Sequence, residues 1–156
     1  MTTVIGAIRG GSVNFPLFLH VLGAMLLVGA LLTVAMSLAL SWRRQWTTAG
    51  LTRLGLRALP LGVVPAWVLM RIGAQWTESE ENLPEQVEES TWLGIGYITA
   101  DAGAIVILVA VVLAVLGLRK LRSGGGSGLA GGAGVLSSLL LAAYLVTVWA
   151  MSAKPD

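Results

Sequence analysis

Four long apolar runs alternate with short polar segments along the chain. They cover roughly residues 15–41, 54–73, 91–118 and 129–151. About 20 helical residues, rising 1.5 Å each, cross the ~30 Å hydrocarbon core of a bilayer. The period-two alternation of membrane barrel strands is absent from these runs, so we expect four transmembrane helices in an all-α fold.

The polar segments between the runs differ in charge, and this difference predicts an orientation. Seven of the ten basic residues lie around the first and third connections: Arg43, Arg44, Arg53, Arg57, Arg119, Lys120 and Arg122. Six of the eight acidic residues lie in the second connection: Glu78, Glu80, Glu81, Glu85, Glu88 and Glu89. Because cytoplasmic loops are enriched in Lys and Arg, we expect one antiparallel four-helix bundle spanning residues 1–156, with both termini outside.

Composition supports a membrane protein and excludes several other classes. Hydrophobic residues make up 56% of the chain and charged residues 12%. A soluble domain needs more charged surface than this, so the expected partner of the chain is the lipid bilayer. The net charge of +2 and the position of the basic residues beside apolar runs argue against nucleic acid. There is no cysteine, which removes disulfides and thiolate metal ligands.

Three segments contain proline, capping or glycine signals that modify this simple pattern of helices. Pro60 and Pro65 are expected to break the second helix. The acidic stretch TESEENLPEQVEESTW has Asn82 as an N-cap and Glu85 three residues later, which indicates a short surface helix or a solvated cover. The stretch RSGGGSGLAGGAG is typical of a flexible linker that leads into a glycine-rich helix.

Ionisable residues inside the apolar runs are the main functional signal. They are His20, Arg71 and Asp101, and such groups cost about 2.5–3.5 kcal/mol each in a membrane span. His20 lies roughly 8 Å and Asp101 roughly 15 Å from the outer ends of their helices, and Arg71 lies near the outer end of its own. Tyr97 and Tyr144 lie at similar levels. We therefore expect these five side chains to form an outward-facing polar pocket or a proton relay.

Each ionisable residue also has a structural interpretation. Arg71 can extend its guanidinium to the interface, or it can pair with Asp101. Asp101 is too short to reach water from its depth, so it pairs, stays protonated or lines a wet cavity. His20 can stay neutral with a hydrogen bond to a carbonyl or hydroxyl group.

Small residues follow His20 on the same helix face. Gly23 and Ala24 lie three and four positions later, which leaves a shallow groove beside the imidazole. A flat macrocycle fits such a groove, and so does a neighbouring helix, because close helix packing uses small residues. Met70 lies at a suitable level to be a soft second ligand, so haem b and copper are both open as cofactors.

The stretch FLHVLGAMLLVGALL resembles the first helix of small bacterial multi-pass membrane proteins that include the copper-resistance D-type group. His20, Gly23 and Gly29 carry the resemblance. It implies the plasma membrane of a bacterium, and some relatives in the wider group look like b-type cytochromes. The chain departs from a bis-histidine cytochrome because it has one histidine. A five-coordinate haem, a His–Met site and a pair of His20 residues across a homodimer are open.

Three functions agree with these features. The first, which we favour, is a membrane protein that binds a metal or haem through His20, as in electron transport. The second is a proton- or ion-translocating homo-oligomer that uses Asp101 and His20. The third is an accessory subunit of a larger membrane complex. The sequence has no nucleophile–base arrangement and no phosphate-binding motif, so an enzyme is the less expected class.

Overall fold

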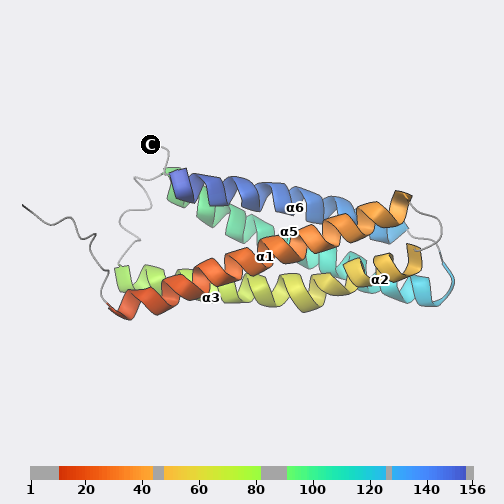
Figure 1. Ribbon diagram of the computed structural model, residues 1–156, viewed down its shortest axis with the longest axis horizontal. Helices are drawn as coiled ribbons and strands as arrows, with labels where there is room; N and C mark the ends of the chain where they lie inside the picture. Colours follow the sequence, from red (N-terminus) through yellow and green to blue (C-terminus); the bar gives the residue numbers. More distant parts are fainter. Residues whose placement is uncertain (1–10, 44–47, 82–90, 126–127, 154–156) are drawn as a thin grey trace, which may run out of the picture.

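The computed structural model describes residues 11–43, 48–81, 91–125 and 128–153, and this part of the chain is all-α (Figure 1). The elements are α1 (Gly11–Arg43), α2 (Thr48–Ala58), η1 (Leu59–Val63), α3 (Val64–Glu81), α5 (Thr91–Arg122) and α6 (Gly128–Ala153). Within the described ranges, four helical segments are long and apolar enough to cross a membrane: Asn14–Trp42, Ala49–Glu80, Gly94–Arg122 and Gly128–Ala153. The four predicted apolar helices are thereby confirmed.

The helices extend beyond the predicted runs at several ends. Helix α1 has 33 residues and α5 has 32, which correspond to about 50 Å and 48 Å of helix. Both exceed the ~30 Å of hydrocarbon, so part of each lies beyond a bilayer core. The apolar run marks the part that lipid can cover, whereas the backbone hydrogen bonds continue into more polar sequence. The surface helix predicted at Asn82 falls outside the described residues.

The two prolines of the second helix do not interrupt it. Helices α2 and α3 continue through η1, a π-helical turn that contains Pro60. The backbone N–H of Val64 donates to the carbonyl oxygen of Leu59, five residues earlier. Proline has no N–H to donate, and the wider turn accommodates it while the helix goes on. The expected break is therefore a local widening.

The glycine-rich connection after α5 turns the chain back toward α6. Gly124 has a φ of 76°, in the left-handed region that glycine adopts without strain, and α6 begins at Gly128. Helix α6 therefore covers residues 128–134 of this stretch, where the sequence predicted a glycine-rich helix start.

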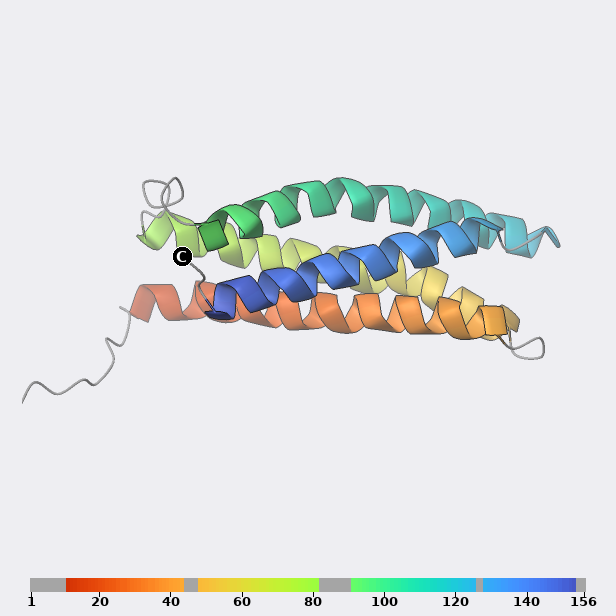
Figure 2. The same ribbon diagram turned by 90° about the horizontal axis from the view of Figure 1, so that it is seen from above.

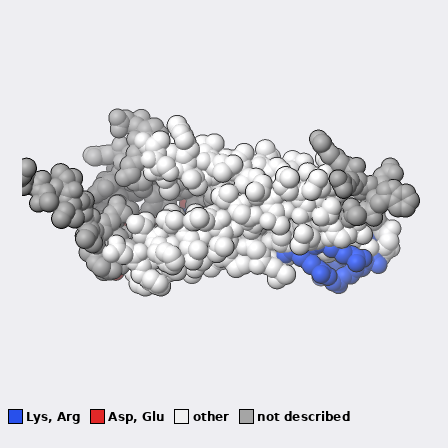
Figure 3. All heavy atoms as spheres, in the orientation of Figure 1, with Lys and Arg blue, Asp and Glu red and all other residues white. Residues whose placement is uncertain are grey.

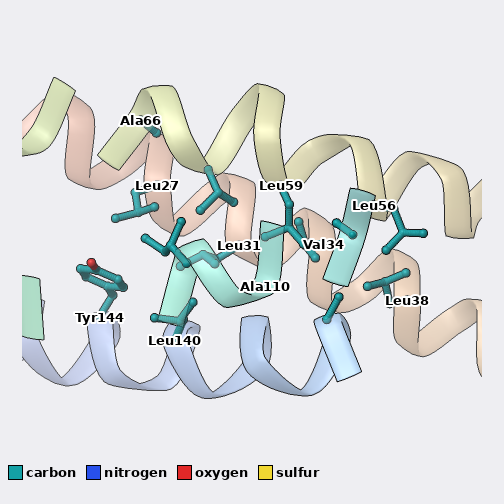
Figure 4. Packing of buried hydrophobic residues seen from close by; sticks show 14 of the residues in the cluster. Leu27, Leu31, Val34, Leu38, Leu56, Leu59, Ala66, Ala110, Leu140 and Tyr144 are labelled. Carbon is teal, nitrogen blue, oxygen red and sulfur yellow. The ribbon is translucent and has the colours of Figure 1, made fainter. Parts of the chain in front are cut away.

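Two pairs of helices, α1 with α3 and α5 with α6, pack most closely, and α1 also packs against α6. All four lie side by side along the long axis in Figures 1 and 2, with successive helices running in opposite directions. The core between them includes Leu27, Leu31 and Val34 of α1, each 0% exposed (Figure 4). Helix α5 contributes small side chains there, among them Ala110 and Ala114, which let it approach its neighbours.

The two ends of the molecule carry different charges. Figure 3 shows Lys and Arg side chains gathered at one end, over α2. The exposed basic side chains described there are Arg53 and Arg57 of α2 and Arg119, Lys120 and Arg122 of α5. Helix α3 ends at the opposite end with Glu78 and Glu80. This separation follows the pattern of charges along the sequence.

Candidate functional site

His20 is held against the neighbouring helix by a hydrogen bond. Its Nδ1 lies 3.1 Å from the carbonyl oxygen of Met70, and the ring is partly buried. A carbonyl oxygen only accepts, so Nδ1 carries the proton in this contact and donates it. Nε2, at the other edge of the ring, is then the nitrogen with the free lone pair. For a neutral His20 the sequence permits a hydrogen bond to a carbonyl or to a hydroxyl group, and the structure contains the bond to a carbonyl.

Glycines bring the backbones of α1 and α3 into direct contact on both sides of this hydrogen bond. A Cβ added to Gly23 would overlap the backbone nitrogen of Met70, and a Cβ added to Gly73 would overlap that of His20. The contact is reciprocal, because each glycine lies three residues after the residue that the other helix touches. The groove beside Gly23 is thus filled by α3, which is the second of the two occupants that the sequence permits.

Arg71 and Asp101 form an ion pair between α3 and α5. Arg71 Nη2 lies 2.8 Å from Asp101 Oδ1. The Arg71 side chain is 22% exposed and the Asp101 side chain 65% exposed. Of the alternatives for these two residues, the ion pair is the one that the structure contains. Asp101 nevertheless presents most of its surface outward, from a helix whose neighbouring exposed residues include Ile98, Ile105 and Leu108.

The two predicted tyrosines lie near this ion pair in different environments. The Tyr97 hydroxyl lies close to Glu78 and within electrostatic range of Arg71 and Asp101. Tyr144 is 4% exposed and lies within electrostatic range of Arg71. Figure 4 shows its hydroxyl pointing from α6 into the interior of the bundle. The five predicted pocket residues therefore come from all four apolar helical segments and lie in the half of the bundle nearer to Glu78 and Glu80 (Figure 1).

Sequence reasoning missed Trp67, which lies one helical turn before Arg71. Its indole Nε1 and the Tyr144 hydroxyl approach each other, but neither buried atom has a hydrogen-bond partner of acceptable geometry among the described residues. The i, i+4 spacing of Trp67 and Arg71 puts both on one face of α3, and this spacing was the available signal.

A groove lies elsewhere, near the basic end between α1 and α6. It has a volume of about 210 Å³ and is lined mainly by small and apolar side chains, including Ala35, Ala39, Gly131 and Gly134. None of the predicted site residues lines it.

Acidic, histidine and cysteine ligands do not cluster in the described residues, where no group of three or more could hold a metal ion. A metal at His20 would therefore need ligands other than a cluster of these residue types, such as a thioether, a porphyrin or a second copy of the chain. No family model matches the chain, and no curated protein or solved structure matches it.

Proposed function

We propose that this chain is an integral protein of a bacterial plasma membrane, an antiparallel four-helix bundle with both termini outside. The four apolar helical segments support the membrane location. The basic side chains gathered at one end support an orientation in which that end faces the cytoplasm. The resemblance of the first helix to the copper-resistance D-type group remains a prediction.

We propose that His20 binds a haem iron through Nε2, at the outer end of the bundle. The observation that carries this proposal is the hydrogen bond from Nδ1 to the Met70 carbonyl oxygen. Histidines that ligate metals commonly donate their other N–H to a carbonyl or carboxylate, which fixes the tautomer and raises the basicity of the ligating nitrogen. The Nδ1–H of His20 donates to a carbonyl oxygen in the same way, which leaves Nε2 able to bind a metal.

The small number of protein ligands favours haem over a bare metal ion. The porphyrin supplies four nitrogen ligands itself, so a single imidazole suffices as an axial ligand. A copper ion would need further soft or imidazole ligands, such as His20 from a second copy of the chain. Because α3 fills the groove at Gly23, the macrocycle belongs at the Nε2 edge of the ring, away from α3. The bound iron would supply one-electron chemistry at the outer surface.

An absorption spectrum tests the proposal directly. The full chain is produced with haem supplied, purified in mild detergent, and measured oxidised and reduced. We expect a haem band that responds to reduction and is lost in His20→Ala. Added imidazole should restore the band if the variant is folded. Met70→Leu keeps the carbonyl oxygen that His20 needs and removes the thioether, so an unchanged spectrum in this variant would exclude a His–Met site.

Other results separate the alternatives. A colourless wild type with haem supplied, or a band that survives in His20→Ala, would remove the haem proposal. A rise in Tm on adding copper that depends on His20, in a colourless protein, would identify copper as the ligand instead.

A second candidate function, a subunit of a homo-oligomer, rests on the exposure of Asp101. A carboxylate 65% exposed on a lipid-facing helix is expensive unless water or protein covers it. A second copy related by a two-fold axis would bring another Arg71–Asp101 pair to this face, with opposite charges adjacent. The natural chain has no cysteine, so Ile105→Cys on the same face can be tested for disulfide cross-linking in membranes. We expect cross-linked dimers that Asp101→Asn reduces, whereas Ala49→Cys on α2 should remain monomeric.

A further inference from the structure

Two buried polar atoms approach each other in the interior, yet neither has a hydrogen bond of acceptable geometry among the described residues. They are Nε1 of Trp67 on α3 and the hydroxyl oxygen of Tyr144 on α6, and neither has a partner among the described residues. Tyr144 is 4% exposed, so bulk water does not reach its hydroxyl. A buried polar group without a partner destabilises the folded state, and native proteins rarely leave two of them side by side.

The two atoms lie where the helix pairs meet. Helix α3 packs chiefly on α1, and α6 chiefly on α5, so Trp67 and Tyr144 belong to different pairs. The Arg71–Asp101 ion pair crosses between the same two pairs, from α3 to α5. This boundary between the α1–α3 pair and the α5–α6 pair, which we call the seam, thus holds both the ion pair and the two buried atoms without a partner.

Space for the hydroxyl at the seam depends on a glycine. A Cβ added to Gly103 of α5 would lie 2.6 Å from the Tyr144 hydroxyl oxygen. Glycine at this position leaves the end of the tyrosine ring free of a side chain from α5. A larger residue would displace the hydroxyl.

The chemistry of the surroundings determines what can bind there. The indole N–H is a donor only, and the tyrosine hydroxyl is a donor that can also accept. The guanidinium of Arg71 lies within electrostatic range and makes the local potential more positive. A hydrogen-bond acceptor of one atom satisfies both groups at once. A donor or a cation can meet only the hydroxyl oxygen and leaves the indole N–H without a partner.

We infer that a small acceptor, either a water oxygen or a halide ion, binds in the seam between Trp67 Nε1 and the Tyr144 hydroxyl. It links α3 to α6, which belong to different closely packed helix pairs. A buried water normally makes two to four hydrogen bonds, and this position supplies two from side chains. The inference does not depend on a metal or haem at His20.

Thermal unfolding of the detergent-purified full chain tests the inference. Tyr144→Phe removes only the hydroxyl. If the hydroxyl is bound to a guest, we expect Tm to fall by about 2–4 °C. Trp67→Phe should lower Tm as well, and the double variant should cost less than the sum of the two single variants. An unchanged or raised Tm in Tyr144→Phe would overturn the inference, because removal of a truly unpartnered hydroxyl relieves a cost.

Two further measurements identify the guest. The series is repeated with gluconate in place of chloride, and the infrared spectrum is compared in ordinary water and in water labelled with oxygen-18. A Tm loss in both salts, with an isotope-sensitive O–H band that disappears in Tyr144→Phe, identifies water. A Tm loss confined to chloride identifies a halide. A Tm loss with neither signature indicates a direct Trp67–Tyr144 hydrogen bond and overturns the inference that a small acceptor binds there. Tyr97→Phe, which changes the chain's other tyrosine, is the control and should keep the band.

Discussion

His20 and Met70 join the first two apolar helical segments, where the imidazole Nδ1 lies 3.1 Å from the Met70 carbonyl oxygen. The bond spans 50 positions in sequence. It is flanked by two glycines, each of which lets the other helix approach to backbone contact. One residue further along α3, Arg71 reaches α5 through Asp101. Met70 and Arg71 of α3 therefore provide polar links to α1 and to α5.

Alanine at either glycine of the α1–α3 contact should destabilise the protein. In Gly23→Ala and Gly73→Ala the new Cβ would overlap a backbone atom of the other helix, so the helices must separate. Such overpacking costs about 1–3 kcal/mol. Gly29→Ala is the matched control, because nothing lies within 4 Å of its added Cβ. Thermal unfolding in detergent should show lower Tm for the first two variants only, and equal Tm for all three would contradict the packing.

The Arg71–Asp101 pair should show energetic coupling. Asp101→Asn leaves the guanidinium of Arg71 without its counter-charge inside an apolar span. A double-mutant cycle with Arg71→Gln should give a coupling of about 0.2–1 kcal/mol if water reaches the pair. The exchanged variant, Arg71→Asp with Asp101→Arg, should recover part of the loss. Purely additive costs would show that the pair is not formed in the membrane.

The fit of Tyr144 against α5 should be visible as a rescue. Gly103→Ala should lower Tm because its Cβ would lie 2.6 Å from the Tyr144 hydroxyl oxygen. In the Tyr144→Phe background the nearest atom would be the ring carbon at 3.3 Å, which needs a smaller adjustment. We therefore expect Gly103→Ala to cost less in Tyr144→Phe than in the wild type. An equal cost in both backgrounds would mean that the hydroxyl lies elsewhere.

Single cysteines should report the orientation, since the natural chain contains none. Ser79→Cys, at the exposed acidic end of α3, should react with a membrane-impermeant maleimide added to intact cells. Ser123→Cys, beside the exposed basic end of α5, should react only after the membrane is opened. The reverse pattern would place the termini in the cytoplasm and remove the proposed outward-facing site.

Hydropathy and charge along the chain were enough to predict the four apolar helices and the separation of charge between their ends. The free energy of transfer from water to lipid is nearly a sum over residues. The composition of a run such as residues 129–151 therefore predicts a membrane span without knowledge of the neighbouring helices. The helix ends were less well predicted. Backbone hydrogen bonding continues past the apolar run, as it does in α3 from Gly73 to Glu81.

Only the tertiary structure decided which of the sequence's alternatives are realised at the polar residues. The residues around Gly23 are compatible with either a cofactor or a helix beside it. Those around Arg71 are compatible with either a free or a paired guanidinium. The outcome depends on which helix lies next to each face, and this is set by the packing of all four together. Trp67 shows the same limit, because an indole in an apolar run looks like an ordinary core residue until Tyr144 is found opposite it. Local composition determines whether a segment lies in lipid or in water, whereas long-range contacts determine the interaction partner of each polar atom.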